Sequence, residues 1–195
     1  MAVPSPSPAP SKSDLRAEGL RRRRAFAASL TPELRAELEE ALARIAAPHL
    51  AGAGVIAAYH PLKDEISPYP LLERLGPGQR AVLPWFAGRD ARMIWRAVPA
   101  VEPSPWGVLQ PSPESEALAP DVVIVPLVLA DRGGTRIGHG KGHYDRALTR
   151  LRESSAPFTI GIAWEEQIVE APIPADLWDI PLDALATPKE WIACG

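Results

Sequence analysis

A glycine-rich segment with several positive charges is the part of the chain best equipped for chemistry. It reads ADRGGTRIGHGKGHYDRALTRL, residues 130–151, and follows the most apolar run of the sequence. Its glycines allow a backbone to approach a ligand and turn N–H groups toward it, and the helix expected after Gly142 adds the positive end of its dipole. Arg136 and Lys141 add full charges. This combination favours a ligand that carries phosphate.

The segment fits neither common nucleotide-binding pattern. GxxxxGK[ST] fails because Thr135 stands where the first glycine belongs, and GxGxxG fails because His143 replaces the last glycine. A glycine-rich turn that only packs a helix onto a strand is the structural alternative. His139 and His143 have the spacing of a helical zinc pair, but the glycines between and beside them disfavour a helix there.

Helices and strands that alternate along the chain must position this segment. Helices are expected over residues 12–29, from Pro32 (capped by Thr31) with a core-facing stripe of Leu34, Leu38, Leu42 and Ile45, over residues 68–75, and from about residue 142 to 153. Strands are expected to begin at Val55, Arg80, Met93, Val122 and Phe158. The run VVIVPLVLA from Val122 is typical of a strand buried on both faces. The expected fold class is therefore α/β, a three-layer α/β/α arrangement with a mostly parallel central sheet.

Composition narrows the class of protein. Of the 195 residues 46% are hydrophobic, which is enough for a real core, and the net charge of -3 gives no general attraction to nucleic acid or to anionic lipid. The single cysteine, Cys194, fits a reducing cytoplasm, and no apolar run approaches the roughly 18 residues of a membrane helix. We expect residues 1–11 to be a disordered Pro/Ser tail and residues 12–195 to form one cytoplasmic domain.

The string RIGHGKGHYDR, residues 136–146, resembles the nucleotide loop of the 5-formyltetrahydrofolate cyclo-ligase family, approximately RLGxGxGYYDR. The resemblance continues along nearly the whole chain after the tail, in KSDLR from Lys12, YHPLKDE from Tyr59, VLP from Val82, WGVLQP from Trp106, GIAWEEQIV from Gly161 and WDIPLDALATP from Trp178. Three positions depart from the family. His143 stands in place of a first tyrosine, Gln110 in place of a frequent glutamate, and Trp178 in place of a frequent histidine.

The resemblance implies an enzyme that converts 5-formyltetrahydrofolate to 5,10-methenyltetrahydrofolate, with ATP as co-substrate, Mg²⁺ as cofactor, and ADP and phosphate as products. In that reaction the formyl oxygen attacks the γ-phosphate, and N10 closes the ring as phosphate leaves. Such an enzyme is expected to act as a monomer, with neither nucleic acid nor a membrane as partner.

The same resemblance assigns roles by position. The catalytic set is Lys141, Arg136 and Tyr144. The nucleotide-binding set is Lys12, Ser13, Asp14, Leu15, Arg16, Arg136, Ile137, Gly138, His139, Gly140, Lys141, Gly142, His143 and Tyr144. The substrate-binding set is His60, Glu65, Met93, Trp106 and Tyr144, and the magnesium ligands are Asp145 and Asp183.

Structural alternatives stand beside these roles. Asp145 would also suit the first turn of a helix, Glu65 a solvated loop, and Lys12 with Arg16 an exposed helix face. Residues 21–24 are four arginines that point in several directions on a helix, so we interpret them as a solvated face rather than a nucleic-acid patch.

Two other classes of function share parts of the pattern. A different nucleotide- or phosphosugar-binding enzyme, such as an isomerase, would keep the glycine loop but has no need of Lys12 and Glu65 together. A non-catalytic relative would have a broken charged set. The set is complete here, which favours the ligase.

Overall fold

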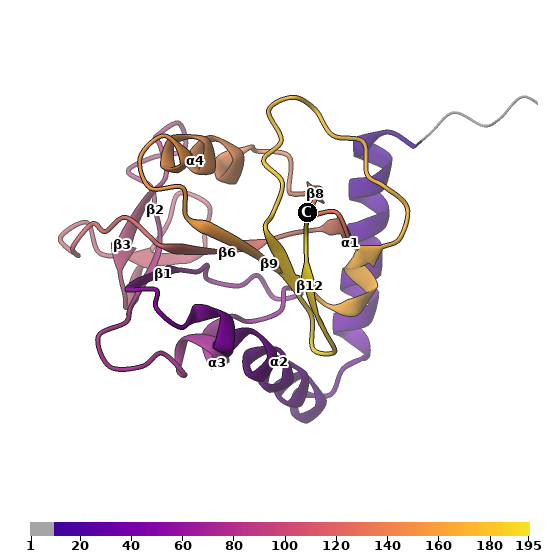
Figure 1. Cartoon of the computed structure of the whole chain (residues 1–195), viewed down its shortest axis with the longest axis horizontal. Coiled ribbons are helices and arrows are strands. Elements are labelled where there is room, and N and C mark those ends of the chain that lie inside the picture. Colours follow the sequence, from indigo (N-terminus) through magenta and orange to yellow (C-terminus); the bar gives the residue numbers. More distant parts are fainter. Residues whose placement is uncertain (1–9) are drawn as a thin grey trace, which may run out of the picture.

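A seven-stranded sheet forms the centre of the computed structural model, which describes residues 10–195 (Figure 1). Its strands are β1 (Val55–Ala57), β2 (Arg80–Trp85), β3 (Ile94–Ala97), β6 (Val122–Pro126), β9 (Phe158–Ile162), β11 (Ala184–Ala186) and β12 (Trp191–Ala193). Smaller sheets contain β4 (Ala100–Pro103), β5 (Leu109–Pro111), β7 (Leu129–Asp131), β8 (Arg136–Ile137) and β10 (Ile168–Val169). The helices are α1 (Lys12–Ser29), α2 (Pro32–Ala46), α3 (Tyr69–Leu72) and α4 (His143–Arg152), with short 3₁₀ turns η1 (Ala47–Leu50) and η2 (Glu165–Gln167).

The central position predicted for the strand from Val122 is confirmed. The sheet order is β12-β11-β9-β6-β1-β2-β3, and β6 is parallel to both of its neighbours. Val122 and Ile124 pack into the core on one face, while Val123 and Val125 pack into the core on the other. Helices α2 and α3 cover the first face and α4 covers the second, so the predicted three-layer arrangement is also confirmed (Figure 1).

We expected the apolar run from Val122 to be one strand, but it forms two, β6 and β7. β6 ends at Pro126, which has no backbone N–H with which to extend a ladder, and β7 then pairs with β8 and β10 in a separate three-stranded sheet. Two of the five glycines, Gly133 and Gly134, lie in the turn between β7 and β8. The glycine loop that leads into α4 is therefore shorter than the sequence suggested and runs from residue 138 to 142.

Helix α1 has the predicted bounds and packs against the small sheet. Ser11 and Asp14 form a capping box at its start, which satisfies free backbone N–H groups of the first turn. A Cβ added to Gly19 would lie 2.9 Å from the Val128 Cγ1 atom, so only glycine permits this close approach of helix and sheet. The packing brings the first turns of α1, with Lys12 and Arg16, beside the glycine loop.

Two expectations about the helices were wrong, one about the burial of Leu34 and one about the length of α3. Leu34 is 43% exposed because the first turn of α2 extends past the core, whereas Leu42 is fully buried. The helix expected over residues 68–75 is only α3, since Arg74 and Leu75 donate to carbonyls three residues back and the chain tightens before Gly76. No helix within residues 10–195 combines the length and the apolar character needed to cross a membrane.

Candidate active site

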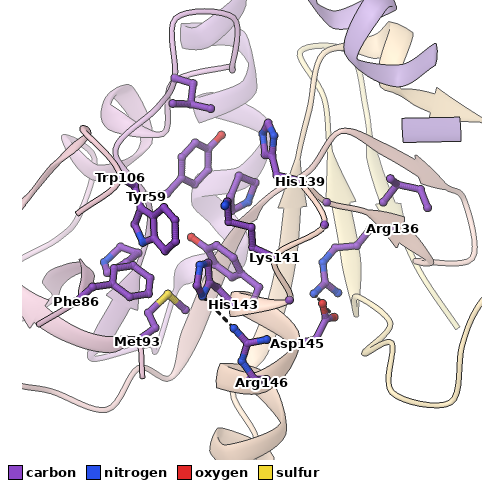
Figure 2. A pocket seen from close by; sticks show the side chains of 18 of the residues that line it. Tyr59, Phe86, Met93, Trp106, Arg136, His139, Lys141, His143, Asp145 and Arg146 are labelled. Carbon is purple, nitrogen blue, oxygen red and sulfur yellow. Dashed lines mark hydrogen bonds and ion pairs between the residues drawn. The ribbon is translucent and has the colours of Figure 1, made fainter. Parts of the chain in front are cut away.

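A cavity of 740 Å³ lies at the carboxyl ends of β1, β2 and β6, the edge where parallel sheets bind ligands (Figure 2). It is bounded by the start of α1, the glycine loop, the start of α4, and a loop that precedes β11. The lining includes Lys12, Arg16, Tyr59, His60, Glu65, Phe86, Met93, Trp106, Gln110, Arg136, Asp176, Trp178, Asp179, and every residue from Ile137 to Arg146. Segments far apart in the sequence thus meet in one place.

The glycine loop forms the phosphate-compatible wall of this cavity. Gly140 and Gly142 have φ angles of 84° and 63°, which residues with side chains rarely adopt. Gly142 is the N-cap of α4, so the positive end of the helix dipole lies at the cavity. The Arg16 Nε atom donates to the Gly138 carbonyl at 2.8 Å and anchors the loop to α1. The Lys141 Nζ atom lies 4.4 Å from the Trp106 ring centroid, and no carboxylate among residues 10–195 is within salt-bridge distance of it.

Two other cations of the cavity, Lys12 and Arg136, are paired with carboxylates. Arg136 binds Asp145 through Nη2 at 2.6 Å and donates from Nη1 to the Ile180 carbonyl. Lys12 binds Asp176 at 2.6 Å and also binds Asp179. Burial alone would lower the pKa of Lys12, but hydrogen bonds to the two aspartates outweigh it and raise that pKa above its ordinary value. These pairs fix the cations in place at the cavity.

The structure separates the two aspartates expected to bind magnesium. Asp145 lines the cavity, but Asp183 does not, because its Oδ2 atom accepts from the Thr159 N and Oγ1 atoms, both at 2.7 Å, beside β9. Asp179, four residues earlier, lines the cavity instead. The backbone N–H of the adjacent Ile180 donates to Asp145 Oδ1 at 3.5 Å. Within residues 10–195 no group of three or more His, Cys, Asp or Glu side chains could hold a metal ion.

Aromatic side chains line the opposite part of the cavity (Figure 2). The His143 ring lies 5.0 Å from Phe86 and 5.1 Å from Trp106, and Met93 is buried beside them. Three buried polar atoms here, Trp106 Nε1, His143 Nε2 and Tyr144 Oη, have no hydrogen-bond partner in the described chain. An aromatic ligand with polar edges would suit both the apolar walls and these atoms.

Two of these groups have shifted pKa values. Burial, with a contribution from the Glu65 charge, raises the pKa of the Tyr144 hydroxyl far above its ordinary value, so it remains a neutral donor. Burial, together with the charges of Arg146 and Lys141, lowers the pKa of His143 below 6.5, so its imidazole is neutral at pH 7.

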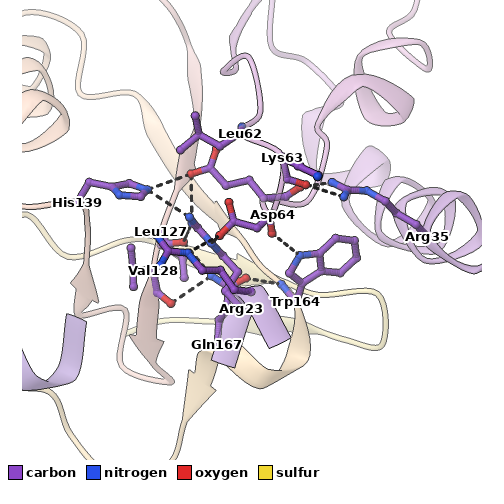
Figure 3. A network of polar contacts seen from close by, with 12 residues as sticks. Arg23, Arg35, Leu62, Lys63, Asp64, Leu127, Val128, His139, Trp164 and Gln167 are labelled. Atoms are coloured by element: carbon purple, nitrogen blue, oxygen red, sulfur yellow. Dashed lines mark hydrogen bonds and ion pairs between the residues drawn. The ribbon is translucent and has the colours of Figure 1, made fainter. Parts of the chain in front are cut away.

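Glu65 is held in a buried polar network rather than solvated (Figure 3). It is 5% exposed, its carboxylate accepts from Leu62 N at 2.9 Å and Arg23 Nη1 at 3.1 Å, and its Oε1 atom lies 3.3 Å from His139 Nε2. Arg23 is 1% exposed, so the expectation of a solvated arginine face was wrong at this position. His60, also in the cavity wall, bonds through Nδ1 to the Tyr69 hydroxyl at 2.6 Å.

Some expected nucleotide contacts do not reach the cavity. Asp14 caps α1, the Ser13 hydroxyl lies 2.7 Å from the Ser11 hydroxyl, and Leu15 packs with the cluster around Val128. None of these three lines the cavity, because α1 turns only Lys12 and Arg16 toward it. Other expected residues, Ile137 to Tyr144 together with His60, Glu65, Met93, Trp106 and Arg136, do line it.

The cavity also contains residues to which the sequence analysis gave no role. Phe86, Asp176, Asp179 and Arg146 lie in its wall. Gln110 is buried and binds the Phe86 backbone in both directions, accepting from its N–H at 3.0 Å and donating to its carbonyl at 3.3 Å. A signal for Asp179 was present in the string WDIPLDALATP, which the resemblance singled out.

Comparisons with known proteins agree on one family. The family model described as the 5-formyltetrahydrofolate cyclo-ligase family matches residues 8–188. The 5-formyltetrahydrofolate cyclo-ligase of Escherichia coli (strain K12) is 32% identical over 175 residues, covering 84% of this chain and 95% of that protein.

Solved structures give the same result. The 5,10-methenyltetrahydrofolate synthetase of Aquifex aeolicus superposes with a TM-score of 0.73 at 29% identity, covering 93% of this chain and 92% of that one. The enzyme of the same name from Mycoplasma pneumoniae gives a TM-score of 0.69 at 25% identity, covering 92% and 99%. The glycine loop and the cavity it borders are therefore those of a member of the 5-formyltetrahydrofolate cyclo-ligase family.

Proposed function

We propose that this protein is an ATP- and Mg²⁺-dependent ligase that cyclises 5-formyltetrahydrofolate to 5,10-methenyltetrahydrofolate. The observation that carries the proposal is one cavity with two complementary parts, a cationic glycine loop at a helix N-terminus and an aromatic wall with a buried carboxylate. A reaction that transfers a phosphoryl group from a nucleotide to a folate needs a phosphate site and a folate site side by side. Membership of the 5-formyltetrahydrofolate cyclo-ligase family supports the choice of this reaction.

The nucleotide is proposed to bind with its triphosphate against residues 138–142. Free backbone N–H groups at the start of α4 and the Lys141 ammonium would stabilise its negative charge. Lys12 and Arg136 already have carboxylate partners, so they would act as part of a mixed-charge wall rather than as free counterions.

The pterin of the folate is proposed to lie among Phe86, Trp106 and Tyr144, with Glu65 at its polar edge. Pterin nitrogens can supply the donors and acceptors that the buried Trp106 Nε1 and Tyr144 Oη atoms lack in the protein. Met93 and His143 complete the apolar wall, and the neutral imidazole of His143 avoids placing a further charge there.

Chemistry would then proceed by activation of the formyl group. The formyl oxygen attacks the γ-phosphorus as the bond to the β-phosphate oxygen breaks, so ADP leaves and an N5-iminium phosphate forms. N10 attacks the formyl carbon, the carbon–oxygen bond breaks, and phosphate departs with the former formyl oxygen as N10 loses its proton. Lys141 would neutralise charge on the transferred phosphoryl group, since phosphoryl transfer depends mainly on positioning and electrostatic stabilisation.

The donor set fits magnesium. The Asp145 and Asp179 carboxylates provide hard oxygen atoms in the same cavity, and the ion's other positions would remain for water and phosphate oxygens. Magnesium, when bound, supplies charge neutralisation and orientation of the phosphates. We further propose that the enzyme acts as a monomer in the cytoplasm, where its single thiol, Cys194, would stay reduced.

An omission series tests this function. Purified protein is mixed with 5-formyltetrahydrofolate, ATP and Mg²⁺, and absorbance is followed in the methenyl-folate band. A rise that disappears when any one component is left out supports the proposal. No rise from a folded protein that binds ATP would contradict it and favour another phosphate-handling reaction.

A further inference from the structure

The buried guanidinium of Arg23 lies between two carboxylates, those of Asp64 and Glu65, and His139 of the glycine loop (Figure 3). Its Nε atom donates to Asp64 Oδ2 at 3.0 Å, and its Nη1 atom donates to Glu65 Oε1 at 3.1 Å and to the Leu127 carbonyl at 3.2 Å. Its Nη2 atom lies 3.4 Å from His139 Nε2. The Arg23 side chain thus contacts the backbone just after β6, the carboxylates of residues 64 and 65, and His139 of the glycine loop.

The backbone of residues 63–65, the segment that carries Glu65, is held from its other side as well. Arg35 donates to the Lys63 and Glu65 carbonyls, at 2.7 and 2.5 Å, and Trp164 Nε1 donates to the Asp64 carbonyl at 3.1 Å. Arg35 and Trp164 therefore hold the backbone of this segment, whereas Arg23 binds its two carboxylate side chains. Arg23 is the one that also contacts the loop side of the cavity.

His139 connects the loop to this network in either of its neutral forms. Its Nε2 atom lies 3.3 Å from Glu65 Oε1 and 3.4 Å from Arg23 Nη2. With a proton on Nε2 the ring donates to Glu65, and with the proton on Nδ1 it accepts from Arg23. Because His139 sits between Gly138 and Gly140, this contact restrains a loop whose own backbone is permissive.

We propose that Arg23 is a positioning residue that fixes Glu65 and His139 relative to each other, so that the nucleotide and the folate bind cooperatively. Because Arg23 contacts both residues, a nucleotide that holds His139 in this arrangement also stabilises the arrangement of Glu65 that binds folate, and folate at Glu65 does the same for His139. The inference rests on the proposed function for the identity of the two ligands.

The test measures this coupling directly by calorimetry. The Kd of 5-formyltetrahydrofolate is determined for the wild-type protein with and without a saturating, non-hydrolysable ATP analogue and Mg²⁺, and we expect binding about tenfold tighter with the analogue. Arg23→Lys keeps a charge but cannot contact both carboxylates and His139, so the ratio of the two Kd values should fall close to one. Arg22→Lys is the matched control, because among residues 10–195 Arg22 pairs only with Glu18 on the exposed face of α1, and it should keep the wild-type ratio.

A second variant avoids dependence on folding of an Arg23 mutant. The His139 side chain is 40% exposed, so His139→Ala should fold, and it should also lose the coupling. Wild-type ratios in both Arg23→Lys and His139→Ala would overturn the inference, as would independent binding of the two ligands to the wild-type protein. Absence of folate binding to the wild-type protein would overturn the proposed function along with it.

Discussion

Replacing Lys141 by alanine should separate catalysis from stability. The Lys141 side chain is exposed, its Nζ atom has no carboxylate partner among residues 10–195, and it makes a cation–aromatic contact with Trp106. An exposed cation–aromatic contact stabilises a protein by about 0.5 to 1 kcal/mol. For a chain of this length that loss would lower the Tm by about 1 to 4 °C.

The effect on turnover should be far larger. A preorganised donor that stabilises transition-state charge contributes about 2.7 to 4 kcal/mol, so kcat should fall by about 10² to 10³. The assay is the rate of methenyl-folate formation at saturating ATP, with Tm measured on the same preparation. Lys189→Ala is the control, since Lys189 is an exposed lysine outside the cavity. A Lys141→Ala enzyme with near wild-type kcat/KM would refute the role of Lys141 at the phosphates.

Three further predictions address the metal, the start of the fold and pH. Asp145→Asn keeps an acceptor for Arg136 but loses charge, so the Mg²⁺ concentration for half-maximal rate should rise about tenfold; an unchanged titration would count against Asp145 as a ligand. Ser11→Ala should lower the free energy of unfolding by about 1 kcal/mol in urea, because it removes the α1 cap, whereas deletion of residues 1–9 should leave kcat/KM nearly unchanged. Because the folded-state pKa of His143 lies below 6.5, the unfolded imidazole takes up a proton first as pH falls. Stability should therefore decrease below about pH 6.5 in wild-type protein, and less steeply in His143→Gln; equal slopes would contradict this.

Local signals in the sequence predicted the elements that begin at a cap or run through the core. Thr31 with Pro32 correctly marked the start of α2, and Gly142 that of α4, because helix starts depend on neighbouring residues. The consecutive apolar residues of β6 predicted its central place, since only a strand covered on both faces buries them all.

Local signals did not predict contacts between residues that lie far apart in the sequence. Arg23 is one of four successive arginines, and its partners Asp64 and Glu65 lie more than 40 residues away, so no helical periodicity distinguishes it from its exposed neighbours. The contrast between Asp179 and Asp183 arises in an irregular stretch, where spacing does not tell which carboxylate faces the cavity and which binds Thr159.

Transfer of the formyl oxygen to phosphate is the most direct test of how the cavity would work. 5-Formyltetrahydrofolate labelled with ¹⁸O in its formyl group is converted with unlabelled ATP and Mg²⁺, and the released phosphate is examined by mass spectrometry. If ATP activates the formyl oxygen, each methenyl-folate formed should be matched by one phosphate that contains ¹⁸O. Methenyl-folate formed with unlabelled phosphate, or without ADP, would contradict this mechanism.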